Sequence, residues 1–261
     1  MNDSELIHPS AVVSAEAELA DDVRVGPFAV IGPRVRIGPG SQVGAHCIVK
    51  GPTTIGANNR FYPFGSIGDD PQDKKYDGEP TRLEIGSGNT IREYCTINRG
   101  TVQDEGVTLL GDNNWLMAYT HIAHDCRVGN DIIMANGAML AGHVHLGDYV
   151  MLSAFVAIHQ FCRIGAHSFI GAYGGIGKDV PPYVLAFGQP PEPRGINAEG
   201  LRRRDFSNEQ IRHLKEAYRI LYRSELRLSE ARGQLAELAE SQPELEILVR
   251  FLDESERGIF R

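Results

Sequence analysis

Residues 110–176 decide the fold: LGDNNW LMAYTH IAHDCR VGNDII MANGAM LAGHVH LGDYVM LSAFVA IHQFCR IGAHSF IGAYGG I. Written in blocks of six, every block begins with an apolar side chain. Because 42% of the residues are hydrophobic, an unbroken run of this kind would arise by chance about once in thirty thousand trials. The stretch is therefore an internal repeat with a period of six residues.

The same period extends toward the N-terminus. Counting by six from Ile7 meets an apolar residue at every step to Ile67, and the count resumes from Ile85 to Ile97 before it slips by one residue. Glycine often follows the aliphatic position, and we expect a positive φ there at a sharp corner, which glycine adopts without steric cost. The position two before the aliphatic residue is mostly small, which predicts packing inside a corner. All four cysteines occupy it: Cys47, Cys95, Cys126 and Cys162.

A period of six fits neither an α-helix nor a simple hairpin array. It fits a triangular solenoid in which each hexapeptide supplies one short strand and one corner, so that three hexapeptides make one coil. Coils stack through parallel strand pairing about 4.8 Å apart, with the aliphatic residue pointing inward. The sequence thus predicts a mainly β protein, a parallel β-helix over residues 1–190.

Two segments interrupt the repeat. Residues 68–84 are rich in polar side chains, yet Ile67 and Ile85 are separated by one full coil, so the coil register survives while a loop is extruded. Residues 99–108 form a second irregular stretch, at the register slip. Loops that depart from a regular repeat commonly carry function, which makes both segments candidates for the active site.

The C-terminal part has a different period. The repeat ends after Ile176, and Ser207 with Gln210 forms a capping box at the start of a helix. A second helix is expected around Leu235 and a third from Pro243. Residues 191–261 are therefore expected to form a linker and a small helical domain. Three short helices bury little surface alone, so they should pack on the β-helix or on a neighbouring subunit.

Composition excludes several classes of protein. The net charge of -8 argues against a nucleic-acid-binding surface. No stretch approaches the roughly 20 apolar residues of a membrane span, so stable membrane insertion is not expected. The N-terminus lacks a basic region followed by an apolar run, which favours a cytoplasmic location. The cysteines form no CxxC pair, which argues against a disulfide framework or a zinc ribbon.

Histidines gather in the regular part of the repeat, with six of the nine between residues 121 and 167. The separations from His124 to His143 and from His143 to His159 are each close to one coil, so the three should lie near one edge of the prism. Histidine suits general-base catalysis because its reference pKa is about 6.5, and Asp125 could fix the tautomer of His124. There is no GxSxG motif and no activated cysteine, so we expect direct transfer without a covalent intermediate, and neither a metal nor a cofactor.

Several motifs are more specific than the repeat. They are 121–126 (HIAHDC), 140–144 (LAGHV), 159–162 (HQFC), 78–82 (GEPTR) and 199–204 (EGLRRR). With these motifs the chain resembles, from end to end, the UDP-N-acetylglucosamine O-acyltransferase family of hexapeptide-repeat transferases. The resemblance implies a left-handed helix and a homotrimer. It also implies the first step of lipid A biosynthesis, in which a (R)-3-hydroxyacyl chain passes from acyl carrier protein to the glucosamine 3-hydroxyl of UDP-N-acetylglucosamine.

The resemblance also implies residue roles. His124 is the general base, Asp125 supports it, and the backbone N–H of Gly142 faces the developing oxyanion. The sugar, phosphate and acyl chain are expected to contact Gln72, Asp73, Lys75, His121, His143, His159, Gln160 and Ala172. The nucleotide and its diphosphate are expected to contact Asn197, Glu199, Arg203 and Arg204. Asp205 departs from the small residue that the family pattern has after the arginines.

Two partners follow from these expectations. Between Arg194 and Arg227 there are nine basic and five acidic residues, a locally positive segment that suits an acidic acyl carrier protein. One prism with histidines on an edge supplies half a cleft, so we expect a homotrimer with sites between adjacent subunits.

Three alternatives remain open from the sequence. The related N-acyltransferase that acts on the acylated glucosamine carries an extra N-terminal domain, whereas this repeat begins at Ile7. A zinc enzyme of the γ-carbonic anhydrase type would use histidines from two subunits as ligands. A non-catalytic solenoid, serving as a scaffold or an ice-binding surface, would need neither the clustered histidines nor the polar loops.

Overall fold

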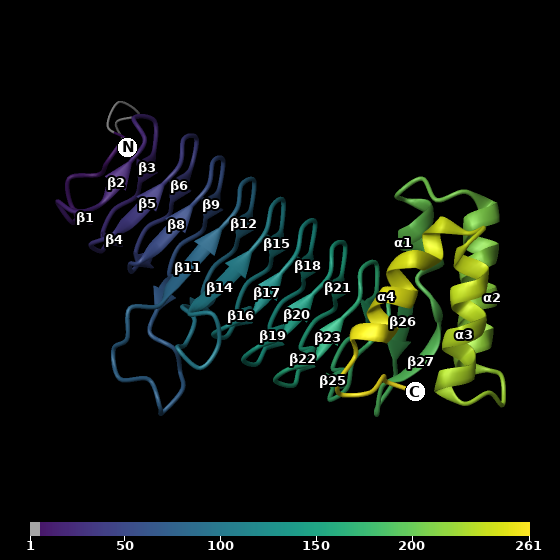
Figure 1. Ribbon diagram of the computed structural model, residues 1–261. Coiled ribbons are helices and arrows are strands. Elements are labelled where there is room, and N and C mark those ends of the chain that lie inside the picture. The colour runs from purple at the N-terminus through teal and green to yellow at the C-terminus, as the bar shows by residue number, and fades with distance from the viewer. Residues whose placement is uncertain (1–5) are drawn as a thin grey trace.

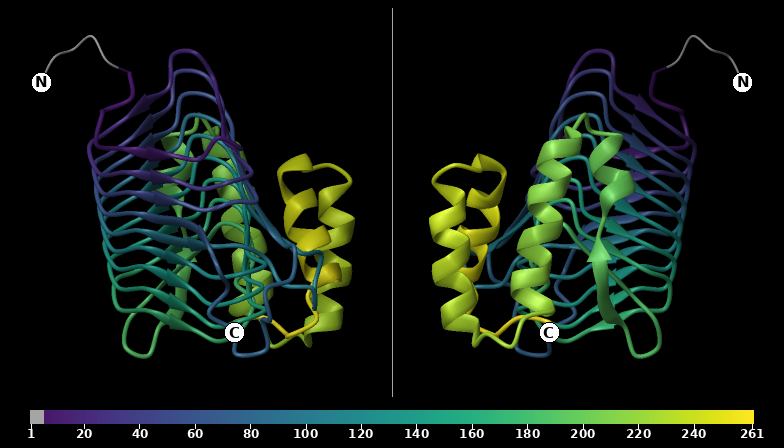
Figure 2. Two further views of the ribbon diagram at one scale, coloured as in Figure 1. Left: turned by 90° about the vertical axis from the view of Figure 1, so that its left-hand side faces the viewer. Right: turned by 90° about the vertical axis from the view of Figure 1, so that its right-hand side faces the viewer.

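The computed structural model describes residues 6–261, and it shows a parallel β-helix followed by a group of helices (Figure 1). Short strands from successive coils stack in register along the axis, and the helices lie at the C-terminal end of the stack. Figure 2, seen from the two ends, shows the coils one behind another and the helices beside them. The predicted parallel solenoid is confirmed.

Within residues 6–261 the strands form three sheets. The first sheet comprises β1 (Val12–Val13), β4 (Val30–Ile31), β7 (Ile48–Val49), β10 (Ser66–Asp69), β13 (Thr96–Asn98), β16 (His121–Ile122), β19 (Met139–Leu140), β22 (Ala157–Ile158) and β25 (Gly175–Ile176). The second comprises β2 (Glu18–Leu19), β5 (Val35–Ile37), β8 (Thr53–Ile55), β11 (Arg82–Ile85), β14 (Val107–Leu110), β17 (Arg127–Val128), β20 (His145–Leu146) and β23 (Arg163–Ile164). The third comprises β3 (Arg24–Val25), β6 (Gln42–Val43), β9 (Arg60–Phe61), β12 (Thr90–Ile91), β15 (Trp115–Leu116), β18 (Ile133–Met134), β21 (Met151–Leu152), β24 (Phe169–Ile170), β26 (Val184–Phe187) and β27 (Glu192–Ile196).

The aliphatic position of each hexapeptide forms the core. In the first sheet Ile122 pairs with Leu140, which pairs with Ile158, so each of these coils consists of three hexapeptides. These side chains are at most 2% exposed. Ile7, at the N-terminal end of the stack, is 43% exposed. Burial of one large aliphatic residue per hexapeptide, worth about 1.5–3 kcal/mol each, stabilises the stack.

The expectation of a positive φ at the glycine after the aliphatic residue is wrong for most coils. Positive φ falls two residues later, at side-chain-bearing residues such as Asn58, Asp125 and His143. Glycine is needed there instead because successive coils lie too close together for a side chain. At Gly38, for example, an added Cβ would lie 2.8 Å from the backbone carbonyl carbon of Gly56 in the next coil.

The small position two before each aliphatic residue is buried, as predicted. The four cysteines are 0% exposed, and Cys47 and Cys126 donate their thiols to backbone carbonyls of the next coil at 2.9 and 3.2 Å. Burial raises the pKa of Cys126 to about 12. A thiol with such a pKa is not a thiolate nucleophile at neutral pH.

The three corners of each coil define three edges along the prism. Edge I joins the first sheet to the second, edge II joins the second to the third, and edge III joins the third to the first. The extruded loops both leave edge I: one runs over residues 70–81 between β10 and β11, the other over residues 99–106 between β13 and β14. Both are slightly shorter than predicted, because their outer residues extend the neighbouring strands.

The C-terminal helices are α1 (Ala198–Arg202), α2 (Asn208–Tyr222), α3 (Leu228–Ala239) and α4 (Glu246–Glu254), with a 3-10 turn η1 (Pro243–Leu245) before α4. The capping box of Ser207 and Gln210 is confirmed. Helix α1 was not predicted, and residue 190 falls in the turn between β26 and β27. The helices share a core that includes Tyr183 from the end of the β-helix. In the part of the chain that the structure describes, every helix is too short or too polar to span a bilayer.

Candidate active site

Edge I brings six of the fifteen predicted site residues into one column. His124 and Asp125 follow β16, Gly142 and His143 follow β19, and Gln160 follows β22 one position after His159. The strand register places His143 above Asp125 and Gly142 above His124, so the two histidines expected to stack are offset by one position. The offset matters chemically because it puts the smallest residue against the His124 ring.

His124 is held by its own neighbour. Its Nδ1 donates a hydrogen bond to Asp125 Oδ2 at 2.8 Å, which leaves Nε2 free to accept a proton. The Asp125 carboxylate also accepts bonds from the backbone N–H and the hydroxyl of Thr101, at 2.7 and 2.6 Å. Burial pushes the pKa of Asp125 upward, but the bonds from His124 and Thr101 outweigh it and hold the pKa below its ordinary value. Asp125 is thus an ionised acceptor that fixes the His124 tautomer.

Gly142 lies directly against the His124 ring. A Cβ added to Gly142 would lie 2.6 Å from Cε1 and 2.8 Å from Nε2 of His124. Backbone conformation does not require glycine here, because the equivalent positions of neighbouring coils carry His124 and Gln160. In other coils this position holds proline, for example Pro27 and Pro63, because its N–H is not needed for the strand ladder. Within residues 6–261 no protein group accepts a hydrogen bond from the Gly142 N–H.

The loop of residues 99–106 closes over edge I. Besides the two bonds from Thr101 to Asp125, Asp104 Oδ2 accepts a bond from His143 Nδ1 at 2.8 Å. Glu105 in the same loop pairs with Arg127 on β17 at 2.5 Å. One loop therefore orients both the carboxylate behind His124 and the neighbouring histidine.

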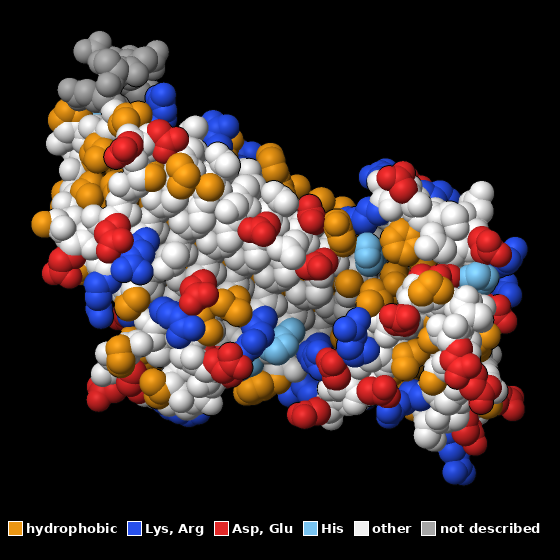
Figure 3. Space-filling view, turned by 45° about the horizontal axis from the view of Figure 1, so that its top comes forward, with side chains coloured by type: hydrophobic (Ala, Val, Ile, Leu, Met, Phe, Trp, Pro, Cys, Tyr) orange, Lys and Arg blue, Asp and Glu red, His pale blue; other side chains and the backbone are white. Residues whose placement is uncertain are grey.

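The loop of residues 70–81 braces the loop of residues 99–106. Arg99 is 7% exposed and donates to the backbone carbonyl of Gly68 at 2.6 Å and to the Tyr76 hydroxyl at 2.9 Å, and it also pairs with Asp70. The predicted contact residues Gln72, Asp73 and Lys75 lie in this loop, outside the column of histidines. Figure 3 shows interspersed acidic and basic side chains between the loops and the C-terminal helices.

The other histidines of the region have distinct surroundings. The His143 ring stacks on Phe161 with a centroid distance of 4.4 Å and meets His124 edge-on at 5.2 Å. His121, on the outer face of β16, hydrogen-bonds Thr96 at 2.7 Å, and its pKa is lowered by burial and by the proximity of His124. His159 lies on edge I and is exposed, with its Nδ1 donating to the carbonyl of Gln160 at 3.1 Å.

The residues expected to bind the nucleotide lie elsewhere. Asn197, Glu199, Arg203 and Arg204 line a cleft of about 730 Å³ over the third sheet, so a single chain does not bring them to His124. Asn197 caps α1 through Gly200 and donates to the carbonyl of His167, which gives it a structural role. Arg204 lies over the Tyr149 ring at 4.7 Å, whereas Glu199 and Arg203 are exposed and pair at 3.1 Å. Asp205 has a φ of 61°, in the left-handed region that favours glycine.

Comparison with known proteins fits this geometry. Residues 108–142 match the bacterial transferase hexapeptide family (six repeats), and residues 179–260 match the family described as UDP N-acetylglucosamine O-acyltransferase, domain 2. The acyl-(acyl-carrier-protein)–UDP-N-acetylglucosamine O-acyltransferase of Thiobacillus denitrificans is 55% identical over 255 residues, which cover 98% of this chain and 99% of that protein. The chain belongs to the UDP-N-acetylglucosamine O-acyltransferase family.

Other members agree over the same length. The corresponding enzyme of Halorhodospira halophila is 52% identical over 98% of this chain and 99% of its own. The solved UDP-N-acetylglucosamine acyltransferase of Francisella novicida superposes with a TM-score of 0.96 at 45% identity, covering 98% of this chain and 94% of that one. The structure from Moraxella catarrhalis gives 0.97 at 45%, covering 98% and 100%. The β-helix is accordingly the left-handed one of this family.

Sequence reasoning missed several residues of this O-acyltransferase site. Thr101 and Asp104 lie in an irregular loop, where the repeat gives no information about side-chain positions. Phe161 could have been found, because Asp125, His143 and Phe161 follow one another at intervals of one full coil and therefore stack. Ala172 lies on edge III and is exposed, at the opposite side of the first sheet from His124.

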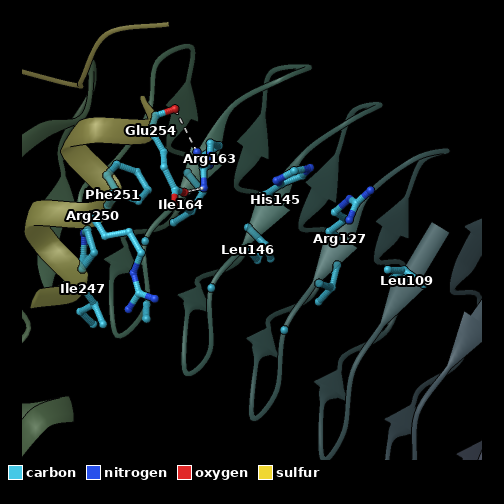
Figure 4. Close-up of a pocket in the computed structure, with 16 residues that line it drawn as sticks. Leu109, Arg127, His145, Leu146, Arg163, Ile164, Ile247, Arg250, Phe251 and Glu254 are labelled. Atoms are coloured by element: carbon cyan, nitrogen blue, oxygen red, sulfur yellow. Dashed lines mark hydrogen bonds and ion pairs between the residues drawn. The ribbon is translucent and has the colours of Figure 1, made fainter. Parts of the chain in front are cut away.

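A second hollow of about 380 Å³ lies between the second sheet and α4 (Figure 4). Arg127, His145 and Arg163 stand in a row along it, with Arg250 and Phe251 facing them from α4. The pKa of His145 is lowered by burial and by the two arginines on either side of it. His145 and Arg163 also line a hollow with His143, but within residues 6–261 no hydrogen bond or ion pair joins this row to His124 or Asp125.

Proposed function

We propose that the chain transfers a (R)-3-hydroxyacyl group from acyl carrier protein to the 3-hydroxyl of UDP-N-acetylglucosamine, the first step of lipid A biosynthesis. The observation that carries the proposal is the His124–Asp125 pair lying against Gly142 on edge I. Relatives that bear this activity in their names match the chain over 98% of its length. We also propose that the reaction takes place in the cytoplasm.

The mechanism follows from the positions of the atoms. Nε2 of His124 accepts the proton of the sugar 3-hydroxyl while Asp125 holds the opposite side of the ring through Nδ1. The resulting oxygen nucleophile attacks the thioester carbonyl, and the free N–H of Gly142 stabilises the oxyanion of the tetrahedral intermediate. The intermediate collapses, the carbon–sulfur bond breaks, and the proton on His124 passes to the departing thiolate. No group of the protein is acylated.

We further propose a homotrimer whose sites combine edge I of one chain with the nucleotide cleft of the next. Edge III carries a ladder of stacked rings 4.9–5.1 Å apart, running through Phe28, His46, Phe64, Tyr94 and Tyr119. The end rings Phe28 and Tyr119 are 59% and 60% exposed. The neighbouring first sheet exposes further apolar side chains, including Met139 at 49%. Such an exposed apolar surface fits burial between subunits.

Mixed trimers test the shared site. When chains carrying His124→Ala are mixed with chains carrying Arg203→Ala, unfolded together and refolded, about one quarter of the sites contain both native residues. We therefore expect kcat/KM near one quarter of the wild-type value from two variants that are nearly inactive alone. The matched control is mixing without unfolding, which leaves the trimers unexchanged. No recovery after refolding, or an active monomer in sedimentation, would contradict a shared site.

The acyl carrier protein has a matching surface on α2. Arg212, Lys215, Arg219 and Arg223 are all exposed, and their spacing of three, four and four residues puts them on one face of the helix. Acyl carrier proteins are strongly acidic, so this basic stripe supplies the charge complementarity that speeds docking.

Ala172 is proposed to limit acyl-chain length; because it lies on edge III, it would do so across the subunit interface of the proposed trimer, where a longer tail would meet its methyl group. Ala172→Gly should shift the kcat/KM preference toward longer 3-hydroxyacyl donors by a factor of about four per additional methylene accommodated. The measurement is the ratio of kcat/KM for successive chain lengths in wild type and variant. An unchanged ratio would show that other residues close the groove.

The function itself is tested by assaying the purified chain with UDP-N-acetylglucosamine and a panel of 3-hydroxyacyl carrier proteins. We expect acylation at the sugar 3-oxygen with a medium-length donor preferred. Acyl transfer to an amino group, or none with any donor in the panel, would refute the proposal.

A further inference from the structure

On edge I, His143 approaches the His124–Asp125 pair, a convergence of three side chains that the proposed reaction does not require. His124 Nδ1 lies 2.8 Å and His143 Nε2 lies 3.7 Å from the same oxygen, Asp125 Oδ2. One ligand atom from each residue lies within 4.8 Å of the other two. Two imidazoles and one carboxylate with a remaining open position form a ligand set typical of zinc.

The separations are close to those of a tetrahedral ion. With metal–nitrogen and metal–oxygen bonds of about 2.0–2.1 Å, neighbouring ligand atoms lie about 3.3 Å apart. The observed 2.8 and 3.7 Å lie on either side of this value, and the two histidine nitrogens lie within 4.8 Å of each other, so rotation of the rings would bring both histidines into range of one ion bound to Asp125.

The protonation of these side chains favours a cation between His143 and Asp125. His143 Nδ1 donates its hydrogen to Asp104, so in the neutral ring Nε2 carries a lone pair and faces the ionised Asp125 carboxylate. Two acceptors thus confront each other, and a cation between them would satisfy both. Asp104 would also orient His143 as a ligand, because a ligating histidine commonly donates the hydrogen of its other ring nitrogen to a carboxylate. Thr101 restrains Asp125 in the same manner.

We propose that His124, Asp125 and His143 bind Zn²⁺ and that the bound ion inhibits acyl transfer. The ion replaces the proton that His124 Nδ1 shares with Asp125, and this proton is released to solvent. Held by the metal, His124 no longer has Asp125 as the acceptor that orients it, and the positive charge of the ion at Nδ1 makes Nε2 on the opposite side of the ring a weaker base for the sugar hydroxyl. The inhibition rests on the proposed function, but the binding does not.

The test is a calorimetric titration of the metal-free, untagged trimer with Zn²⁺, together with absorption spectroscopy of the Co²⁺-loaded protein. We expect about one ion per chain and the intense visible bands of four-coordinate Co²⁺. His143→Ala should abolish this binding, and His143→Gln serves as a second variant if alanine impairs folding. Asp104→Asn should weaken Zn²⁺ binding by about 10–100-fold through the loss of the orienting carboxylate.

Matched controls separate this site from surface binding. Glu105→Gln removes the same charge from the same loop but does not touch His143, and His145→Ala removes a histidine from the adjacent strand. Both should bind Zn²⁺ as the wild type does. Absence of binding, or binding that survives in both His143 variants, would overturn the proposal whatever the acyltransferase assay shows. If the ion binds as expected but no acyl transfer exists to inhibit, the proposed function fails and the metal site stands.

Discussion

Replacing His124 by alanine is expected to lower kcat by about 10²–10⁴-fold, because general-base assistance is lost at the sugar hydroxyl. The fold should survive, since the ring lies at the surface of edge I and Asp125 keeps both of its bonds from Thr101. Loss of one hydrogen bond to a buried carboxylate should lower the free energy of unfolding by about 1–3 kcal/mol. Steady-state kinetics and thermal unfolding of the purified variant measure the two effects.

The control for this variant is His145→Ala, which removes an equivalent ring from the neighbouring strand β20 without a contact to Asp125. Its kcat should stay within a few-fold of the wild-type value. Near-normal turnover in folded His124→Ala protein would show that another group takes the proton.

Gly142→Ala is expected to have the second-largest effect, a fall in kcat of about 10²–10³-fold. The new Cβ would lie 2.6–2.8 Å from ring atoms of His124, so the ring must move away from the position in which it meets the sugar hydroxyl. The same methyl group would crowd the N–H that faces the oxyanion. Because both effects act on the transition state, kcat should fall far more than KM rises.

A double variant distinguishes crowding from a general loss of stability. In a His124→Ala background the methyl group of Gly142→Ala meets no ring and crowds only the N–H, so the second substitution should lower kcat by a smaller factor than it does in the wild type. Gly195→Ala is the matched control, because a Cβ there meets nothing within 4 Å. If the double variant instead lost kcat by the product of the two single factors, Gly142 and His124 would act independently and not as one catalytic unit.

The fold could be predicted because a six-residue repeat is a local pattern with a single consistent three-dimensional solution. The coil spacing also placed His124, His143 and His159 near one edge. The exact partners needed the structure: a shift of one residue puts Gly142 rather than His143 above His124. In the same way, close coil contact rather than positive φ explains glycine at Gly38.

The rest of the site could not be read from spacing. Thr101 and Asp104 reach Asp125 and His143 through an irregular loop whose path depends on the buried Arg99. The nucleotide group around Arg203 lies over the third sheet, because β26 and β27 turn back along that face before α1 begins. Motif resemblance, and not periodicity, connected these residues to one reaction.

The most direct measurement of the central claim is a single-turnover assay with enzyme in excess over a labelled 3-hydroxyacyl carrier protein. It is run with and without UDP-N-acetylglucosamine, on wild type and His124→Ala. Direct transfer predicts that label moves to the sugar 3-oxygen only when the sugar is present, that no label attaches to the protein, and that the single-turnover rate falls by about 100-fold or more in the variant. Label on the protein in the absence of sugar, or an unchanged rate in His124→Ala, would contradict it.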